Sequence, residues 1–218
     1  MNIFIVIPAY NEGSVIYKNI LEIKKYFNNI VVVDDGSTDN TKEQALASEV
    51  KVLRHIINRG QGASLRTGIN YALKNGADII VTFDADGQFN PEEINPLITE
   101  LNSGQYDIIL GSRFKGTSKV PLLKRQVLFL GTLFTKVITG LNISDTHNGF
   151  RVLNRRSAES IKIRQDRMAH SSEILHQTSK LKLKYKEMPV TVKYTEYSKY
   201  KGQKISGAFK IFFDLIFK

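Results

Sequence analysis

Two carboxylates separated by one residue follow a run of apolar residues near the middle of the chain. Residues 79–83 have the composition of a buried strand, and Asp84 and Asp86 come directly after them. Acids this close repel each other unless a cation lies between them. Mg²⁺ and Mn²⁺ prefer oxygen ligands and complete their shell with water and substrate phosphates. The segment therefore suggests a divalent metal site, although an Asp-rich turn exposed to solvent has the same pattern.

Two earlier apolar runs end in the same way. Residues 3–7 are followed by the segment 8–12, Pro-Ala-Tyr-Asn-Glu, and residues 30–33 by the segment 34–37, Asp-Asp-Gly-Ser. Open α/β sheets bind ligands at the carboxyl ends of their parallel strands. We therefore expect the three loops to meet at one edge of a sheet.

The elements that must position these loops alternate along the chain. Apolar runs predict strands over 3–7, 30–33, 51–56, 79–83, 106–110 and 149–153, and one or two strands, interrupted at Pro189, over 184–193. Helical spacing and capping patterns predict helices over 16–27, 37–47, 63–75, 91–103, 122–138 and 171–181. Parallel neighbours require crossover helices, so the alternation predicts an α/β fold with a mostly parallel central sheet and helices on both faces.

Composition and charge restrict the class of protein. The 218 residues fit one large α/β domain, and the absence of cysteine excludes disulfides and thiolate metal sites. The start of the sequence lacks a secretory signal, so we expect a cytoplasmic protein. Residues 1–112 carry 9 Lys and Arg against 14 Asp and Glu, a net of −5, whereas residues 113–218 carry 22 against 7, a net of +15. The second half is therefore expected to meet an anionic partner.

The last fourteen residues form an unusually apolar segment. If residues 205–218 are helical, apolar side chains cover most of the helix surface, and such a helix needs a partner. The segment is shorter than the ~20 residues that span a bilayer. It could pack on its own domain, on a small membrane protein or in the membrane interface.

The three strand-end motifs together resemble family 2 glycosyltransferases. Further matches are the segment 58–63, Asn-Arg-Gly-Gln-Gly-Ala, the segment 111–113, Gly-Ser-Arg, and the segment 145–151, Asp-Thr-His-Asn-Gly-Phe-Arg. The sequence is most similar to the polyprenyl-phosphate branch, whose type is dolichol-phosphate mannose synthase, and the resemblance runs from residue 3 to about residue 206. It implies a GT-A (Rossmann-like) domain over 1–204, with a nucleotide-sugar half (1–112) and an acceptor half (113–204).

The resemblance also implies roles for single residues. The residues implied to bind the nucleotide sugar are Pro8, Tyr10, Glu12, Asp35, Arg59, Gly60, Asp84, Lys201 and Lys204. The implied metal ligands are Asp84, Asp86 and Gln88, with Mg²⁺ or Mn²⁺ as cofactor. The implied catalytic residues are Asp86, Arg113 and Asp145, and the acceptor residues are Arg113 and Arg151. Lys201 and Lys204 stand where the family pattern predicts arginine, so a bidentate clamp on the diphosphate is not expected from them.

The chemistry of the acceptor separates two enzyme hypotheses. A phosphate is already anionic near neutral pH and needs cations such as Arg113 or Arg151, whereas a sugar hydroxyl needs a base, for which Asp145 and Glu173 are the candidates. His147 and His170 are expected to make ordinary hydrogen bonds. The leading hypothesis is an inverting, metal-dependent enzyme that moves a sugar from a UDP- or GDP-sugar to polyprenyl phosphate, as a peripheral protein at the cytoplasmic face of the membrane.

Three alternatives remain open at this stage. The first is transfer to a saccharide hydroxyl of a cell-wall or surface glycan. The second is a nucleic-acid-binding protein, suggested by the basic pI of about 9.6, but the acids at the strand ends and the lack of a known binding motif argue against nucleic acid as a partner. The third is an inactive relative that serves as a scaffold, against which the intact Asp84 and Asp86 argue.

Overall fold

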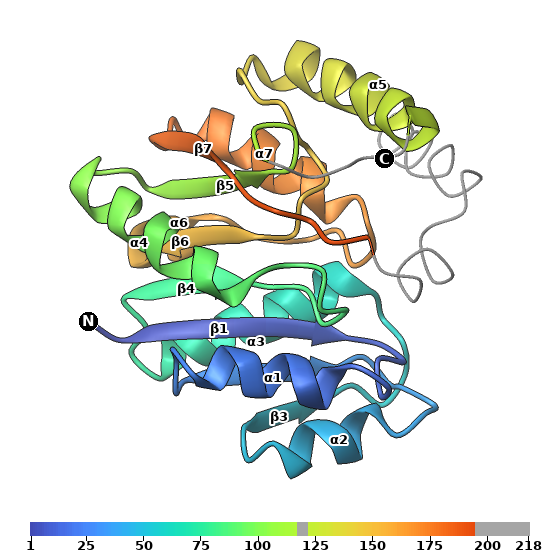
Figure 1. The fold of residues 1–218 in the computed structure, drawn as a ribbon. Helices are drawn as coiled ribbons and strands as arrows, with labels where there is room; N and C mark the ends of the chain where they lie inside the picture. The colour runs from blue at the N-terminus through green and yellow to red at the C-terminus, as the bar shows by residue number, and fades with distance from the viewer. Residues whose placement is uncertain (117–121, 195–218) are drawn as a thin grey trace.

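The computed structural model describes residues 1–116 and 122–194, which fold around one sheet (Figure 1). The strands are β1 (Ile3–Ala9), β2 (Ile30–Asp34), β3 (Lys51–Arg54), β4 (Ile79–Thr82), β5 (Ile108–Ser112), β6 (Arg151–Asn154) and β7 (Tyr185–Pro189). Their order in the sheet is β3-β2-β1-β4-β6-β5-β7. All pairings are parallel except those of β6, which runs antiparallel to both β4 and β5. The predicted α/β class and mostly parallel sheet are confirmed.

The register of the strands brings the predicted loops together. Ala9 at the end of β1 pairs with Asp34 at the end of β2. Val6 pairs with Thr82, the last residue of β4. The carboxyl ends of β1, β2 and β4 therefore lie side by side, as the sequence predicted.

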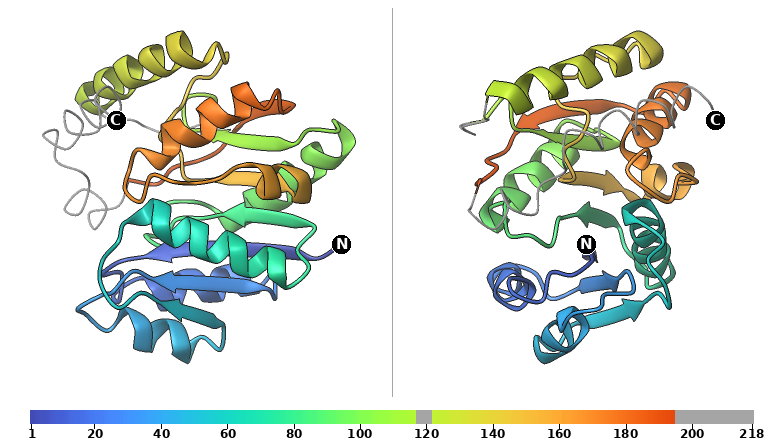
Figure 2. Two further views of the ribbon diagram at one scale, coloured as in Figure 1. Left: turned by 180° about the vertical axis from the view of Figure 1, so that it is seen from behind. Right: turned by 90° about the vertical axis from the view of Figure 1, so that its right-hand side faces the viewer.

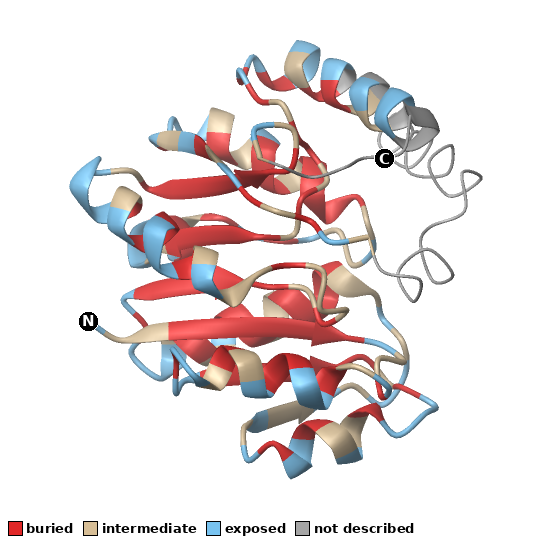
Figure 3. Cartoon of the chain, in the orientation of Figure 1, coloured by how far each residue is buried: buried red, intermediate tan, exposed pale blue. Residues whose placement is uncertain are grey.

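Helices cover both faces of the sheet (Figures 1 and 2). They are α1 (Ile16–Lys24), α2 (Thr41–Ala47), α3 (Gln61–Lys74), α4 (Ile94–Ser103), α5 (Leu122–Thr139), α6 (Arg155–Ser160) and α7 (His170–Lys180), with a 3₁₀ turn η1 (Pro91–Glu93) before α4. One core contains residues of α1, α2 and α4 with one face of the strands, and the other contains residues of α3, α6 and α7 with the opposite face. The central strands β1, β2, β4, β5 and β6 are almost entirely buried, whereas the edge strands β3 and β7 are partly exposed (Figure 3).

Some predicted elements differ in detail from the observed ones. The helix expected from residue 37 begins at Thr41, because the Ser37 hydroxyl accepts a hydrogen bond from the Asn11 backbone N–H (2.9 Å) and Asp39 Oδ1 accepts one from the Thr41 backbone N–H (3.0 Å). Over 184–193, strand β7 ends at Pro189, where the sequence predicted an interruption, and Val192 beyond it forms only an isolated bridge with Phe89. Helix α6 was not predicted. The C-terminal helix expected over 205–218 lies outside the described residues.

None of the described helices is long and apolar enough to cross a membrane. Helix α5 is the longest of them, with 18 residues, and it lies beyond the β7 edge of the sheet, where it packs on α7 (Figure 1).

We predict that Gly68→Val destabilises the fold. A Cβ atom at Gly68 would lie 2.3 Å from Val6 Cγ1 and 3.2 Å from Val33 Cγ2, because α3 packs directly on β1 and β2 there. The overpacking should lower the free energy of unfolding by about 2 kcal/mol, measured by urea denaturation. Asn70→Val introduces the same side chain on the exposed face of α3 and should change it by less than about 0.5 kcal/mol. Equal effects of the two variants would contradict the packing argument.

Candidate active site

Asp84 lies at the end of β4 and is held by neighbours from four other parts of the chain. Gln61 donates its amide N–H to Asp84 Oδ1 (3.0 Å), and the Asn19 amide donates to the backbone carbonyls of Asp84 and Ala85 (3.2 Å each). Burial raises the pKa of Asp84, the charges of Arg151 and Arg113 oppose that rise, and the charge of Glu12 adds to it. Because Glu12 lies in the loop after β1, its effect on this pKa indicates that the loop approaches Asp84, as predicted.

The acids after β4 form a donor set that suits a hard divalent ion. Asp86 Oδ1 accepts a hydrogen bond from the Gln88 backbone N–H (3.1 Å), which fixes the turn between them. In the parts of the chain that the structure describes, no three His, Asp or Glu side chains gather as a complete metal cage. Two carboxylates that are not part of a larger cluster of His, Asp or Glu suit Mg²⁺ or Mn²⁺ that takes its remaining ligands from phosphates and water, and the role of Gln88 as a ligand stays a prediction.

The loops after β1 and β2 are joined to each other. Thr41 Oγ1 accepts a hydrogen bond from the Glu12 backbone N–H (2.7 Å), and the Asn11 side chain accepts one from the Thr38 backbone N–H (2.9 Å). Pro8 is buried within β1, whereas Tyr10 is exposed on the rim. Pro8, Tyr10 and Glu12 therefore lie on the same edge as Asp84, as predicted.

Asp35 is engaged within the protein. Its carboxylate accepts hydrogen bonds from the backbone N–H groups of Arg59 (3.0 Å) and Gly60 (2.6 Å), and its Oδ1 lies 2.6 Å from His55 Nδ1. These contacts fix the loop that precedes α3 against the end of β2. The sequence reasoning missed His55, although its place at the end of a short strand opposite an acid was a possible signal. A contact of Asp35 with a nucleotide stays a prediction.

The Gly-Ser-Arg segment meets the segment that begins at Asp145. Arg113 Nε donates to Asp145 Oδ2 (2.6 Å), and Arg113 Nη2 donates to the His147 backbone carbonyl (3.0 Å). Burial alone would lower the pKa of Arg113, but the ion pair with Asp145, together with the nearby Tyr194, outweighs burial and the pKa is raised. Glu187 of β7 accepts the backbone N–H groups of Ser144 (2.7 Å) and Asp145 (3.1 Å) and so holds the acid in place.

Arg151 is a buried cation beside these acids. It is 2% exposed, and burial lowers its pKa to about 10, against the opposing charges of Asp84 and Asp145. Within the described ranges, Arg151 Nη1 and Nη2, Asp145 Oδ1 and His147 Nδ1 have no hydrogen-bond partner. Burial also lowers the pKa of His147. Arg151 thus balances buried negative charge, and its predicted role toward an acceptor is untested.

Helix α7 packs beside α3 on one face of the sheet, and its first turn lies near Arg151. His170 is buried at its first turn, where its Nδ1 lies 2.8 Å from the Arg167 carbonyl oxygen, and burial followed by the charge of Arg151 lowers its pKa to about 3. Glu173 accepts hydrogen bonds from the backbone N–H groups of Arg164 and Gln165 (2.9 Å each). Glu173 therefore stabilises a loop, and its carboxylate is not placed to act as a base.

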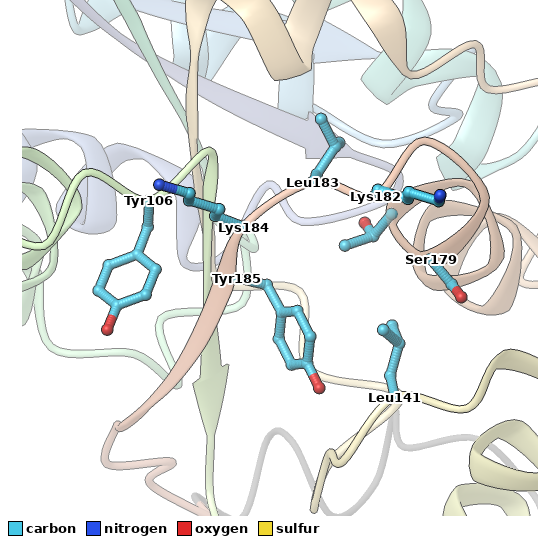
Figure 4. A pocket seen from close by; sticks show the side chains of 8 residues that line it. Tyr106, Leu141, Ser179, Lys182, Leu183, Lys184 and Tyr185 are labelled. Carbon is cyan, nitrogen blue, oxygen red and sulfur yellow. The ribbon is translucent and has the colours of Figure 1, made fainter.

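The structure thus gathers most of the predicted site. Asp84, Asp86, Glu12, Arg113, Asp145 and Arg151 lie at one edge of the sheet, together with Gln61 and His147, which the sequence reasoning did not select. Lys201 and Lys204 lie outside the described residues. A separate pocket of about 400 Å³ lies near the opposite edge, between the amino ends of β5 and β7 and the end of α7, where Tyr106, Leu141, Ser179 and Tyr185 line it (Figure 4). It is distinct from the candidate site.

The family model described as Glycosyl transferase family 2 matches residues 4–162. The chain belongs to this family. Among similar proteins, an uncharacterised protein of Methanocaldococcus jannaschii is 40% identical over 98% of this chain and 90% of its own length. The UDP-N-acetylglucosamine–dolichyl-phosphate N-acetylglucosaminyltransferase of Methanococcus voltae is 34% identical over 98% of this chain and 94% of its own. The predicted polyprenyl-phosphate branch of the family is therefore confirmed.

A solved structure with the same fold is a glucosyl-3-phosphoglycerate synthase of Mycobacterium tuberculosis, crystallised with Mn²⁺, UDP and phosphoglyceric acid. It superposes with a TM-score of 0.76 at 16% identity and covers 99% of this chain and 77% of its own. This likeness confirms the predicted GT-A fold of the described residues.

We predict that Gly149→Ala impairs the glycosyltransferase by displacing Asp84. A Cβ atom at Gly149 would lie 2.4 Å from Asp84 Oδ1 and 2.5 Å from Oδ2, so the carboxylate must move. Displacement of a site group by about 1 Å should reduce nucleotide-sugar turnover about 100-fold. Gly140→Ala is the control, because Gly140 has a positive φ of +67° but no atom within 4 Å of the added Cβ. Loss of turnover in both variants alike would point to lost stability instead.

We predict that His170 makes stability fall as the pH is lowered. Its pKa is about 3 in the folded protein and ordinarily 6.5, so between these values the unfolded chain binds a proton that the folded chain excludes. The free energy of unfolding should fall as the pH drops from 6.5 toward 3, measured by urea denaturation at several pH values. His170→Gln should flatten this dependence, whereas His176→Gln, exposed on the same helix, should not. A His170→Gln curve parallel to the wild type would contradict the assignment.

Proposed function

We propose that this glycosyltransferase moves a sugar, with inversion at the anomeric carbon, from a UDP- or GDP-sugar to polyprenyl phosphate at the cytoplasmic face of a membrane. The observation that carries the proposal is the gathering at one sheet edge of the acids after β4 with the buried Arg113. The name of the Methanococcus relative, a dolichyl-phosphate transferase, supports the acceptor class.

The first half of the chain supplies the donor site. Asp84 and Asp86 would hold Mg²⁺ or Mn²⁺, and the structural neighbour with Mn²⁺ and UDP supports this choice. A bound divalent ion stabilises the negative charge that develops on the departing diphosphate. Gln61 keeps Asp84 oriented, and Tyr10 and Glu12 border the place of the nucleotide.

The second half favours a phosphate acceptor over a sugar hydroxyl. A hydroxyl must lose its proton to a base, but Asp145 is ion-paired with Arg113 at 2.6 Å and Glu173 is bound by backbone N–H groups. A phosphate oxygen is anionic already and needs only orientation and charge balance. Arg113 and Lys115 lie on the segment after β5 and would supply cations there.

We predict that Asp86→Asn reduces sugar transfer at least about 1,000-fold, because a neutral amide holds a divalent ion far less well than a carboxylate does. The measurement is a screen of nucleotide sugars with Mg²⁺ or Mn²⁺ that records released UDP or GDP with and without polyprenyl phosphate. Asp78→Asn is the matched control, since Asp78 lies just before the amino end of β4 and should leave transfer unchanged.

The screen also separates the alternatives. Release that requires polyprenyl phosphate supports the proposal, whereas transfer to a glycan in its absence would select a sugar hydroxyl as acceptor. Full activity of Asp86→Asn would overturn the metal assignment.

A further inference from the structure

Helix α5 packs against the protein through its polar side. Thr132, Thr135 and Thr139 are buried, and Thr135 and Thr139 each donate their hydroxyl to the backbone carbonyl four residues earlier (2.9 and 2.7 Å). The Thr139 carbonyl in turn accepts a hydrogen bond from the Ser179 hydroxyl of α7 (2.5 Å). Most helices of globular proteins bury an apolar face, whereas the buried residues of α5, among those whose burial the structure describes, are these three threonines.

The opposite side of α5 presents large apolar side chains to solvent. Phe129, Leu133 and Val137 follow each other at intervals of four residues and are 62%, 49% and 78% exposed. Residues at this spacing share one helix face. We call these three residues the outer stripe of α5. Ile138, 53% exposed, adds apolar surface beside it.

The charges of α5 are all of one sign. Its sequence contains Lys124, Arg125 and Lys136 and no Asp or Glu. Arg125 is exposed and precedes Phe129 by four residues, and Lys136 lies on the flank of the stripe. An apolar stripe bordered by cations is the pattern of helices that lie in the interface of an anionic membrane.

We propose that the outer stripe of α5 docks the protein on the surface of an anionic phospholipid bilayer. The inference deepens the proposed function and rests on it, because a polyprenyl phosphate acceptor is held in a bilayer. The 18 residues of α5 extend about 27 Å and would lie along the surface. Its middle adjoins the site, since a Cβ atom at Gly131 would lie 3.1 Å from His147 Cε1. Docking through this stripe places the acceptor half of the site at the lipid surface.

Two other occupants fit the charges less well. A second copy joined stripe to stripe would bring the cations of two α5 helices together, which like-charge repulsion opposes. The segment 205–218 of this chain carries Lys210, Asp214 and Lys218, a net positive charge, so it offers no counter-charge to the flank of α5. An anionic bilayer satisfies both the apolar stripe and its cations.

The test compares Leu133→Asp with Leu46→Asp in the full-length protein. Leu46 lies on α2 and is 50% exposed, against 49% for Leu133, so the two changes are matched in burial and charge. Sedimentation with vesicles of phosphatidylcholine and phosphatidylglycerol should show binding of the wild type and of Leu46→Asp. Leu133→Asp should bind about tenfold less, since it removes a leucine from the apolar contact and adds a charge. Val137→Asp should repeat the loss at a position that contributes less to folding.

Several outcomes would overturn the inference. Equal vesicle binding by Leu133→Asp, Val137→Asp and the wild type is one. A wild-type dimer in solution that Leu133→Asp dissociates would assign the stripe to a second copy. Loss of binding in Phe213→Asp, with Leu133→Asp unaffected, would assign the contact to the C-terminal segment.

A second assay separates this inference from the proposed function. Transfer to a short, water-soluble polyprenyl phosphate without vesicles should be the same in Leu133→Asp and the wild type. If the wild type transfers no sugar to polyprenyl phosphate but binds vesicles through the stripe, the proposed function fails and the docking surface stands. If transfer occurs and the stripe has no effect on vesicle binding, the docking surface fails alone.

Discussion

The structure depends on placing two carboxylates and two guanidinium groups together at a buried sheet edge. Asp84 and Asp145 are matched there by Arg113 and Arg151, and only the pair of Arg113 with Asp145 is in direct contact. Buried charges are costly unless opposite charges compensate them, and a single unpaired member would destabilise the rest. The charges of Arg151 and Arg113 therefore help to keep the buried Asp84 carboxylate ionised, the form in which it could bind a cation. This constraint couples the two halves of the chain, since each half supplies one of the acids and the second half supplies both arginines.

Strand β6 is the element that satisfies this constraint. It runs antiparallel between β4 and β5, which places Arg151 opposite Thr82, two residues before Asp84. The residue before Phe150 must then pass close to the Asp84 carboxylate, and only glycine fits at position 149. Each residue of the segment Gly-Phe-Arg thus has a structural role. Gly149 allows the close approach to Asp84, Phe150 packs in the core, and Arg151 balances the buried negative charge. Phe150 completes this arrangement by packing edge-on against Phe83, with ring centroids 5.2 Å apart.

The sequence predicted the parallel part of the fold because β1 to β5 alternate with helices, and parallel neighbours leave few other topologies. It could not predict that β6 lies between β4 and β5 in the sheet, because the long segment between β5 and β6 contains no signal that selects a neighbouring strand. The same limit applies to the site. Residues fixed by their own strand ends, such as Asp84 and Glu12, were found, whereas His55 and Gln61 become significant only through contacts across loops. Asp35 shows a further limit, because the sequence does not reveal that the chain itself uses much of the hydrogen-bonding capacity of this carboxylate, and its contact with a nucleotide stays a prediction.

Helix α5 shows why composition alone misleads about orientation. Its apolar residues would ordinarily predict an inward apolar face, yet the buried residues among those whose burial is described are Thr132, Thr135 and Thr139. The hydroxyls of Thr135 and Thr139 bond to the helix backbone, and that of Thr132 accepts a hydrogen bond from the Thr146 hydroxyl (3.5 Å). Small side chains on this side, with Gly131 against His147, let the helix approach the acceptor side of the site closely. Larger apolar residues there would hold it farther from His147 and would loosen the support of the Asp145 segment. Among the described residues of α5, the small ones therefore occupy the side that approaches the site, and Phe129, Leu133 and Val137 are left exposed, so close packing beside the site and the outer stripe have a common cause.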